Sequence, residues 1–208
     1  MQLINAEIDR YLLEVTPRRP SILQEMEALA RERNFPIVGP LVGRLCQQMV
    51  LATGAKRIFE MGSGFGYSAF WMAMVLPEEG KIICTERSQE NIDLATAFFR
   101  RAGLLDKADF LRGDALDIIQ EVEGQFDIIM NDVEKERYPQ ALDLMVPRVR
   151  KGGFIITDNM FWHGRVVEPN PGPDTMGVLQ YTRRVCESKE LLTTIIPLRD
   201  GVALSLKI

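Results

Sequence analysis

The sequence contains little cysteine and histidine, and this scarcity excludes two classes of small site. Its 208 residues include three cysteines and one histidine. Cys46, Cys84 and Cys186 are far apart in the chain and form no Cys-x-x-Cys pair. This spacing predicts neither a disulfide framework nor a zinc site. We expect the three cysteines to be reduced and mostly buried.

Long apolar runs and an excess of positive charge are also missing. No apolar run approaches the ~18 residues of a membrane-spanning helix, and the amphipathic N-terminal segment carries Glu7, Asp9 and Arg10, unlike a signal peptide. A cytoplasmic protein without membrane contacts is expected. The formal net charge of −4 gives no general attraction for nucleic acid, so a small-molecule partner is favoured.

Composition and length indicate one globular domain. Apolar residues make up 46% of the chain and charged residues 26%, which is ordinary for a globular protein, and no tract has the composition of a linker. A chain of this length can form one α/β domain with a sizeable core but has little room for two. We therefore expect residues 1–208 to form a single domain, with residues 1–54 as its helical N-terminal region.

Beyond the N-terminal region, predicted strands and helices alternate. Helical spacing predicts helices over residues 4–15, 21–33 and 41–52, with a capping box of Ser21 and Gln24 and a stop at Gly54. The repeated βαβ pattern that follows predicts a parallel sheet with helices on both faces. Its strands are predicted at residues 56–61, 81–85, 109–112, 126–131 and 154–157, and its helices at residues 67–76, 88–102 (capped by Ser88), 116–122 and 136–146.

The C-terminal segment departs from this alternation. A loop rich in proline and glycine (residues 168–174) and a helix ending near Ser188 are followed by two apolar strands, "TTIIPL" and "VALSLKI". Only residues 199–201 separate the strands, which predicts a hairpin with an Asp-Gly turn. The predicted fold is therefore α/β, a doubly wound and mostly parallel sheet with a C-terminal antiparallel hairpin.

A glycine-rich turn follows the first predicted strand, in the run "EMGSGFGYS" from Glu60 to Ser68. Glycines at such a turn let the backbone approach a ligand and point amides at it. The dinucleotide fingerprint would need its third glycine at Tyr67, so the spacing speaks against a nicotinamide-binding oxidoreductase. Glu60 suits a cationic ligand better than a pyrophosphate, whose charge it would repel. The alternative is a tight turn without a ligand.

This run resembles motif I of the class I (Rossmann-like) S-adenosylmethionine (SAM) methyltransferases. The resemblance implies that Glu60 lies near the methionine part of SAM and that Glu86, after the second strand, binds the ribose hydroxyls, which a carboxylate can accept. A solvated strand end is the alternative for Glu86. Asp114 and Ala115 match the segment near the adenine. The candidate SAM-binding residues are Glu60, Gly62, Gly64, Gly66, Ser68, Glu86, Asp114, Ala115 and Asp132.

Two later strands end in side chains that carry oxygen. Asp132 follows the strand at residues 126–131, and Asp158 and Asn159 follow the strand at residues 154–157. Ligands of open α/β sheets bind at the carboxyl ends of strands, so these side chains should converge. Hard oxygen donors without histidine or cysteine suit Mg²⁺ or Ca²⁺ better than zinc. Each segment taken alone also fits a turn or a helix cap.

The pattern Phe-Asp-x₄-Asp-x₂-Lys-x₂-Tyr at residues 126–138, followed by Asp158-Asn159 and Trp162, resembles the cation-dependent O-methyltransferases of the catechol and caffeoyl-CoA type. The resemblance assigns Asp132, Asp158 and Asn159 to a divalent cation. It assigns catalysis to Asp132 and Lys135, with Lys135 in proton transfer; a solvated lysine is the alternative.

Three positions depart from the pattern usual in that family. Glu134 replaces a second aspartate, Gly64 replaces a larger residue, and Asn131 replaces an apolar one. Neither the Glu134 nor the Asn131 change removes a proposed ligand, whereas the smaller Gly64 bears on how SAM is held. Asn131 requires a hydrogen-bond partner if it is buried.

Together these features predict an enzyme that methylates one hydroxyl of a small ortho-dihydroxylated aromatic, using SAM and Mg²⁺ or another divalent cation. Ionising a phenol at pH 7 costs roughly 4 kcal/mol, and a cation reduces that cost. The alternatives are a hydroxylated tRNA nucleoside as acceptor, a nicotinamide-binding oxidoreductase, and a SAM-binding protein without activity. By analogy with relatives we expect a homodimer, with residues 1–54 serving substrate and dimer contacts.

Overall fold

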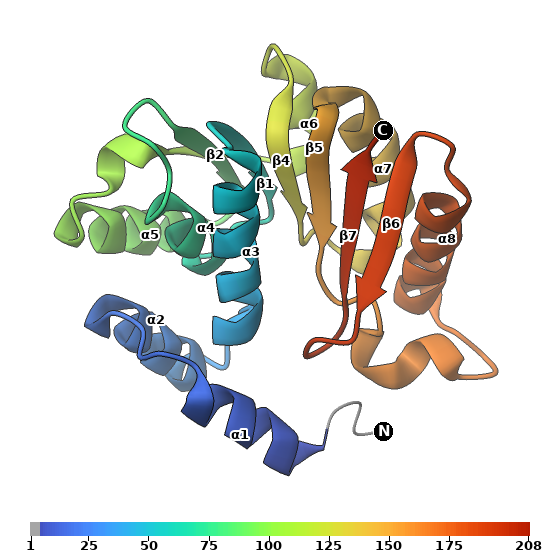
Figure 1. Ribbon diagram of the computed structural model, residues 1–208, viewed down its shortest axis with the longest axis horizontal. Helices are drawn as coiled ribbons and strands as arrows, with labels where there is room; N and C mark the ends of the chain where they lie inside the picture. Colours follow the sequence, from blue (N-terminus) through green and yellow to red (C-terminus); the bar gives the residue numbers. More distant parts are fainter. Residues whose placement is uncertain (1–4) are drawn as a thin grey trace.

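The computed structural model describes residues 5–208. These residues form a seven-stranded sheet of order β3-β2-β1-β4-β5-β7-β6, with helices on both sides (Figure 1). Strands β1 to β5 pair with one another in parallel, and β7 is antiparallel to both of its neighbours, β5 and β6. The predicted doubly wound sheet with a terminal antiparallel hairpin is confirmed. The strands are β1 (Arg57–Met61), β2 (Lys81–Glu86), β3 (Ala108–Arg112), β4 (Phe126–Asn131), β5 (Val149–Thr157), β6 (Leu191–Ile196) and β7 (Val202–Lys207).

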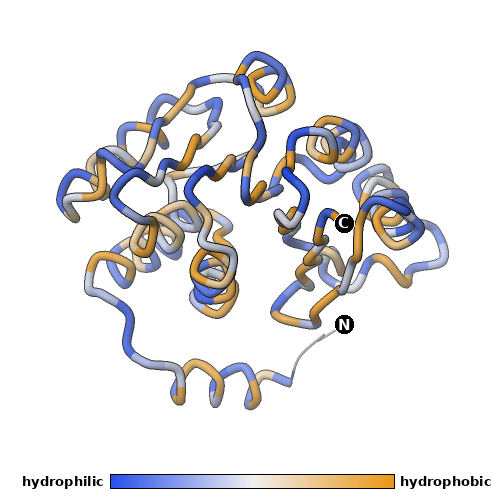
Figure 2. Tube along the Cα trace, turned by 45° about the horizontal axis from the view of Figure 1, so that its top comes forward, coloured by the Kyte–Doolittle hydropathy of each residue, from blue (hydrophilic) through white to orange (hydrophobic). Residues whose placement is uncertain are grey.

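Helices cover the two faces of the sheet in two groups. Buried residues of α2–α5 pack with Ile58 and Ile128 on one face, and buried residues of α6–α8 pack with Phe59 and Ile129 on the other. Neighbouring residues of a strand thus point to opposite faces of the sheet. Along the helices, apolar and hydrophilic segments follow each other in alternation (Figure 2). No helix of the described chain is long and apolar enough to cross a membrane. The helices are α1 (Ala6–Val15), α2 (Ser21–Glu32), α3 (Gly39–Thr53), α4 (Tyr67–Ala73), α5 (Gln89–Arg101), α6 (Ala115–Glu121), α7 (Tyr138–Arg148) and α8 (Pro173–Glu187), with 3₁₀ turns η1 (Leu105–Lys107), η2 (Lys135–Arg137) and η3 (Trp162–Val167).

The local signals at helix ends are confirmed in two of three cases. The Ser88 hydroxyl accepts the backbone N–H of Asn91 at 3.4 Å, and Gly54 ends α3 with a φ of 59°. The capping box is wrong: Pro20 precedes the first residue of α2 and has no capping side chain, while the Gln24 amide donates to the carbonyl of Arg19 at 2.9 Å. The extended backbone that proline readily adopts begins this helix without a side-chain cap.

Some predicted bounds differ from the structure. The helix predicted to residue 76 ends at Ala73. Strand β5 begins at Val149, which pairs with Phe126 of β4 before the register shifts between Phe126 and Ile128. The predicted turn type is also wrong in detail. Residues 197–201 connect β6 to β7, and the left-handed positions are Arg199 (φ 51°) and Gly201 (φ 83°). Of the first predicted helix, residue 4 lies outside the described residues.

The strand order determines where a ligand can bind. From β1 the chain proceeds outward through β2 to β3 on one side of the sheet, and through β4 to β5 on the other. Ligands of open α/β sheets bind outside the carboxyl ends of the strands at such a reversal. The glycine turn after β1 and the acidic ends of β4 and β5 therefore share one edge of the sheet.

Gly177 lets α8 pack closely against η2, and this contact can be tested. A Cβ atom at this position would lie 2.1 Å from the carbonyl oxygen of Lys135. Gly177→Ala is expected to lower the free energy of unfolding by about 1–3 kcal/mol because backbone must move. Gly172→Ala is the control, since its Cβ would meet nothing within 4 Å and its φ is −72°. Denaturant unfolding measures both; equal stability of the two variants would contradict the packing argument.

Candidate active site

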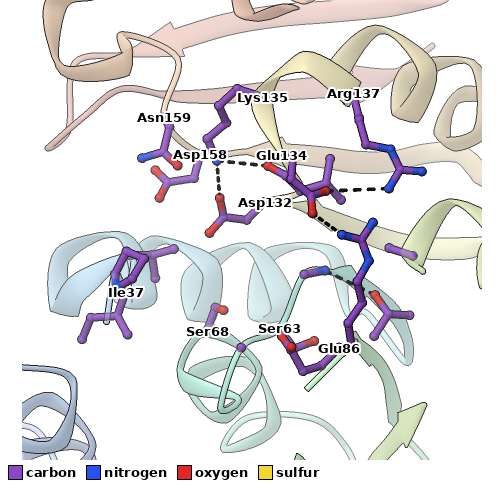
Figure 3. Close-up of a pocket in the computed structure, with 18 of the residues that line it drawn as sticks. Ile37, Ser63, Ser68, Glu86, Asp132, Glu134, Lys135, Arg137, Asp158 and Asn159 are labelled. Carbon is purple, nitrogen blue, oxygen red and sulfur yellow. Dashed lines mark hydrogen bonds and ion pairs between the residues drawn. The ribbon is translucent and has the colours of Figure 1, made fainter. Parts of the chain in front are cut away.

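A cavity of about 600 Å³ opens at the carboxyl ends of β1, β2, β4 and β5 (Figure 3). Its size lies within the ~300–1,000 Å³ typical of small-molecule sites. One wall comes from the residues before α3, at positions 35–38, and the other from Asn159, Trp162 and His163. The structure brings ten of the predicted site residues to this cavity, but Glu60 and Gly66 do not line it. Those ten are Gly62, Gly64, Ser68, Glu86, Asp114, Ala115, Asp132, Lys135, Asp158 and Asn159.

The glycines of the turn after β1 have distinct structural roles. A Cβ on Gly62 would lie 2.6 Å from the carbonyl oxygen of Asp132, so only glycine allows the turn to approach the end of β4. Gly64 faces the ring of Phe35, which lies 2.8 Å from the position of its missing Cβ. Gly66 starts α4 with a φ of 82° and packs toward Ala95 of α5. Gly66 therefore shapes the turn from behind the cavity wall.

Glu60 is a fully buried acid just before the glycine turn. Neither of its carboxylate oxygens has a hydrogen-bond partner of normal geometry among the described residues. Burial raises the pKa of Glu60 to about 7, and the nearby hydroxyls of Ser68 and Ser63 partly oppose this rise. Burial has removed the hydration of this acid, and the two hydroxyls compensate only in part, which is unfavourable for the charged form.

Protein hydrogen bonds engage one carboxylate oxygen of Glu86 but both carboxylate oxygens of Asp114. Glu86 ends β2, and its Oε1 accepts the backbone N–H of Ser88 at 2.7 Å, which leaves the second oxygen for a ligand. Asp114 caps α6 by accepting the N–H of Leu116 at 2.9 Å. Its other oxygen accepts from Arg87 and from Arg137, each at 2.6 Å. The side chain of Asp114 is thus fully engaged, although Asp114 and Ala115 line the cavity.

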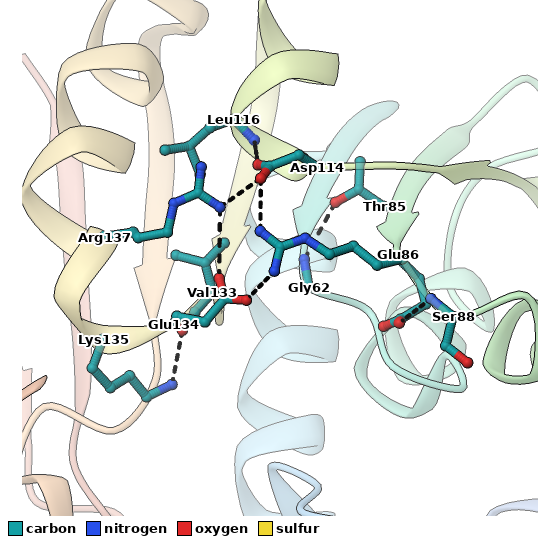
Figure 4. A network of polar contacts seen from close by, with 11 residues as sticks. Gly62, Thr85, Glu86, Ser88, Asp114, Leu116, Val133, Glu134, Lys135 and Arg137 are labelled. Carbon is teal, nitrogen blue, oxygen red and sulfur yellow. Dashed lines mark hydrogen bonds and ion pairs between the residues drawn. The ribbon is translucent and has the colours of Figure 1, made fainter.

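The contacts of Asp114 belong to a four-residue ion-pair cluster at the cavity rim (Figure 4). Arg87 also pairs with Glu134, and Arg137 lies 3.7 Å from the same carboxylate. The Arg137 guanidinium, helped by Arg87, holds the pKa of Asp114 well below its usual range. Glu134, one of the departures from the family pattern, is therefore ion-paired. Sequence reasoning missed both arginines, because no local pattern links residues that meet only through folding.

Lys135 and Asp132 form an ion pair in the wall of the cavity. The Lys135 ammonium donates to Asp132 Oδ1 at 2.7 Å and to the carbonyl of Val133 at 3.2 Å. The lysine is 7% exposed, and its nitrogen lies 5.0 Å from the ring centre of Tyr138 and 5.5 Å from that of Trp162. Aromatic faces attract such a cation. Lys135 is thus a buried side chain and does not project into solvent from the start of a helix.

Asp158 lies on the neighbouring strand end, close to the same pair. The side chain is buried, and burial raises the pKa of Asp158 to about 7, with the negative charge of Asp132 adding to the rise. The backbone of Asp158 is fixed from both sides. Its N–H donates to the carbonyl of Asn131 at 3.3 Å, and its carbonyl accepts the Tyr138 hydroxyl at 2.8 Å. Two carboxylates are therefore held close together with one ammonium beside them.

Asn159 completes the group of oxygen donors on this edge. It has a left-handed backbone with φ 57°, and its amide nitrogen donates to Asp200 at 3.1 Å. Asp132, Asp158 and Asn159 all line the cavity (Figure 3). No cluster of three or more His, Cys, Asp or Glu with a metal-binding arrangement occurs in residues 5–208. The assignment of a cation to two carboxylates and one amide stays a prediction.

The β6–β7 connection touches both walls of the cavity. Asp200 accepts the backbone N–H of His163 at 2.7 Å, and Arg199 donates to the carbonyl of Ile37 at 2.8 Å. Sequence reasoning interpreted Asp200 only as part of a turn, because an Asp-Gly pair between strands carries no other local signal.

Asn131 is fully buried, and neither atom of its amide has a hydrogen-bond partner within residues 5–208. The partner that its burial requires is therefore not provided by the described protein atoms. This position on β4 lies directly before Asp132, so the unpaired amide adjoins the acidic strand end.

Comparison with known proteins identifies the family. A family model described as O-methyltransferase matches residues 12–208. Caffeoyl-CoA O-methyltransferase of Eucalyptus gunnii is 30% identical, over 96% of this chain and 86% of that protein. Caffeoyl-CoA O-methyltransferase 1 of Arabidopsis thaliana is 29% identical, over 97% of this chain and 85% of that protein.

Solved structures agree with this comparison. An O-methyltransferase from Bacillus cereus in complex with SAH superposes with a TM-score of 0.88 at 27% identity, over 97% of each chain. The O-methyltransferase TomG from Streptomyces achromogenes in complex with SAM shares the fold with a TM-score of 0.88 at 24% identity, over 97% of this chain and 96% of that one. The fold is that of the class I methyltransferases, as predicted. The chain belongs to the O-methyltransferase family and is a SAM-dependent O-methyltransferase.

Proposed function

We propose that this enzyme transfers the methyl group of SAM to one hydroxyl of a small ortho-dihydroxylated aromatic, assisted by a divalent cation. The observation that carries the proposal is the position of Asp132, Asp158 and Asn159 in the same cavity as the glycine turn and Glu86. The curated relatives are named caffeoyl-CoA O-methyltransferases, and a caffeoyl group carries two neighbouring phenolic hydroxyls. Family membership speaks against the nicotinamide alternative.

The residues around the glycine turn fit SAM. The second oxygen of Glu86 can accept from a ribose hydroxyl, and the buried Ser63 hydroxyl has no partner within the described chain. The negative charge of Glu60, directly behind the turn, would attract the ammonium group of the methionine part. When bound, SAM supplies an electrophilic methyl group. Glycine at position 62 lets this turn lie directly against the Asp132 carbonyl at the end of β4, so the SAM-binding turn and the acidic strand end adjoin each other.

The donors at the ends of β4 and β5 fit a hard divalent cation, for which we propose Mg²⁺. Two carboxylates and an amide oxygen are ligands that Mg²⁺ accepts while other positions stay open. The like charges of Asp132 and Asp158 oppose each other in a buried site, and a positive ion would relieve this repulsion. When bound, a divalent cation acts as a Lewis acid toward the acceptor hydroxyl.

Lys135 and Asp132 are the proposed catalytic residues. Lys135 would hold the proton that leaves the acceptor hydroxyl, and Trp162 beside it would orient an aromatic ring. An amine accepts a proton only in its neutral form, so this role requires Lys135 to be uncharged when the acceptor hydroxyl gives up its proton. The burial of Lys135 against the rings of Tyr138 and Trp162 keeps its ammonium group beside the oxygen donors at the ends of β4 and β5.

Assembly and location are further proposals. We propose one domain over residues 1–208 and a cytoplasmic homodimer, with residues 1–54 serving substrate and subunit contacts. Helix α1 lies at the periphery (Figure 1), and its side chains Ile8, Tyr11 and Val15 are 52%, 58% and 57% exposed. Apolar side chains gathered on an exposed helix often mark an interaction surface.

Asp158→Ala tests the cation assignment. The variant loses a buried carboxylate of the proposed ligand set, so cation-dependent methylation of a catechol should be abolished while SAM affinity stays within about fivefold of wild type. Turnover with and without EDTA, together with SAM titration calorimetry, measures the two effects. A variant that stays fully active would show that the cation is assigned to the wrong residues.

Glu60→Gln tests whether the pKa of Glu60 is raised in the folded protein. As pH rises from 4.5 to above 7, the carboxyl of the unfolded chain ionises before that of the folded chain, so the ligand-free wild type should lose about 3 kcal/mol of unfolding free energy from this group. Glu60→Gln should escape this loss and bind SAM more weakly. Denaturant unfolding at pH 4.5 and pH 8 measures it, with the exposed Glu78→Gln as control. If the difference in unfolding free energy between Glu60→Gln and wild type is the same at both pH values, the pKa of Glu60 is not raised.

The acceptor class can be tested directly against the tRNA alternative. Methyl transfer is expected to a panel of catechols and not to total tRNA, because the formal net charge of −4 provides no general attraction for a polyanion. Transfer of radiolabelled methyl groups from SAM measures both reactions under the same conditions. Efficient labelling of tRNA with no catechol product would replace the proposed substrate class.

A further inference from the structure

Asp200 joins the β6–β7 connection to the strand end that carries Asn159. One oxygen of its carboxylate accepts from the Asn159 amide nitrogen at 3.1 Å, and the other accepts the backbone N–H of His163 at 2.7 Å. The Asp200 side chain is only 15% exposed. Both partners have left-handed backbones with φ 57°. A single carboxylate therefore supports an unusual backbone segment and one side chain of the cavity wall.

These contacts go beyond the formation of a turn. Aspartate in a turn usually bonds to backbone groups about two residues away, whereas the partners of Asp200 are 41 and 37 residues away in sequence. Backbone bonds independently attach the connection to the same segment, from Met160 N–H to the carbonyl of Gly201 at 3.0 Å and from Phe161 N–H to the carbonyl of Asp200 at 2.8 Å. Because these backbone bonds already attach the connection to this segment, the Asp200 carboxylate is not needed for the attachment itself. Its bond to the Asn159 side chain is a separate contribution.

The charge of Asp200 determines which end of the Asn159 amide faces the cavity. A carboxylate ion only accepts hydrogen bonds, so the NH₂ group of Asn159 must face it. The amide oxygen then points away from Asp200. Only this oxygen can ligate a cation, because the amide nitrogen carries hydrogens and has no available lone pair.

We propose that Asp200 is a positioning residue that fixes the Asn159 amide so that its oxygen joins Asp132 and Asp158 in the cation site. This inference rests on the cation site of the proposed function. It adds a fourth side chain, which touches no reacting atom and acts on the cation through Asn159.

Asp200→Asn tests the proposal with little change in shape. The new amide can still accept from His163 N–H through its oxygen, but its NH₂ group then faces Asn159. Asn159 must rotate its amide to accept this bond, which turns its own NH₂ group toward the cation site. Titration calorimetry with Mn²⁺ should show an affinity about 10–100-fold lower than wild type, the range for residues that orient metal ligands. SAM affinity and thermal stability should stay near wild type.

The exchange of the two residues provides a rescue. In the double variant Asn159→Asp with Asp200→Asn, the amide at position 200 donates to the carboxylate at position 159 while still accepting from His163. A carboxylate presents an oxygen at either end, so Mn²⁺ affinity should recover to near the wild-type value. The control is Glu168→Gln, which removes one exposed charge beside η3 and should change affinity by less than about twofold.

The outcomes separate this inference from the proposed function. If wild type binds no Mn²⁺, the cation site fails and the role of Asp200 fails with it. If wild type binds Mn²⁺ and Asp158→Ala does not, but Asp200→Asn binds as tightly as wild type, only the role of Asp200 is overturned. A loss that the exchange does not rescue also overturns it. Should Asp200→Asn fail to fold, Asp200→Ser replaces it, with the same loss of affinity expected.

Discussion

Parallel pairing of β4 with β5 sets the positions of both acidic strand ends. The two strands pair Asn131 with Thr157, so Asp132 and Asp158 follow at the same level. A hydrogen bond from the Asp158 N–H to the Asn131 carbonyl at 3.3 Å extends the ladder one step further. A slip of one residue in this register would send one carboxylate to the opposite face of the sheet. The remainder of the site is arranged around this pair.

The site contains buried acids and an unpaired amide that lower the stability of the ligand-free protein. Glu60 and Asp158 are buried acids whose pKa values burial raises to about 7, and the Glu60 carboxylate and the Asn131 amide have no hydrogen-bond partner among residues 5–208. Each feature lowers the stability of the ligand-free protein. Such features concentrate at functional sites; here Asp158 lines the cavity, and Glu60 and Asn131 lie at the strand ends behind it. Ligands with complementary charge or hydrogen-bonding groups would stabilise these buried acids and this amide.

Contacts between distant segments shape the part of the cavity in which the proposed acceptor would lie. Arg199 binds the carbonyl of Ile37 on one wall, and Asp200 binds Asn159 and His163 on the other. The β6–β7 connection therefore fixes the separation of the walls between which an aromatic ring would lie.

Much of the fold and part of the site could be predicted from the sequence. The period of apolar residues gave the alternating elements, and the placement of Asp132, Asp158 and Asn159 after apolar strands indicated their common edge, because strand ends of a parallel sheet meet there. Tertiary structure alone decided that Glu60 lies behind the cavity, that Arg87 and Arg137 occupy Asp114, and that Asp200 reaches Asn159. Periodicity and turn chemistry act over a few residues, whereas these contacts join segments that only packing brings together.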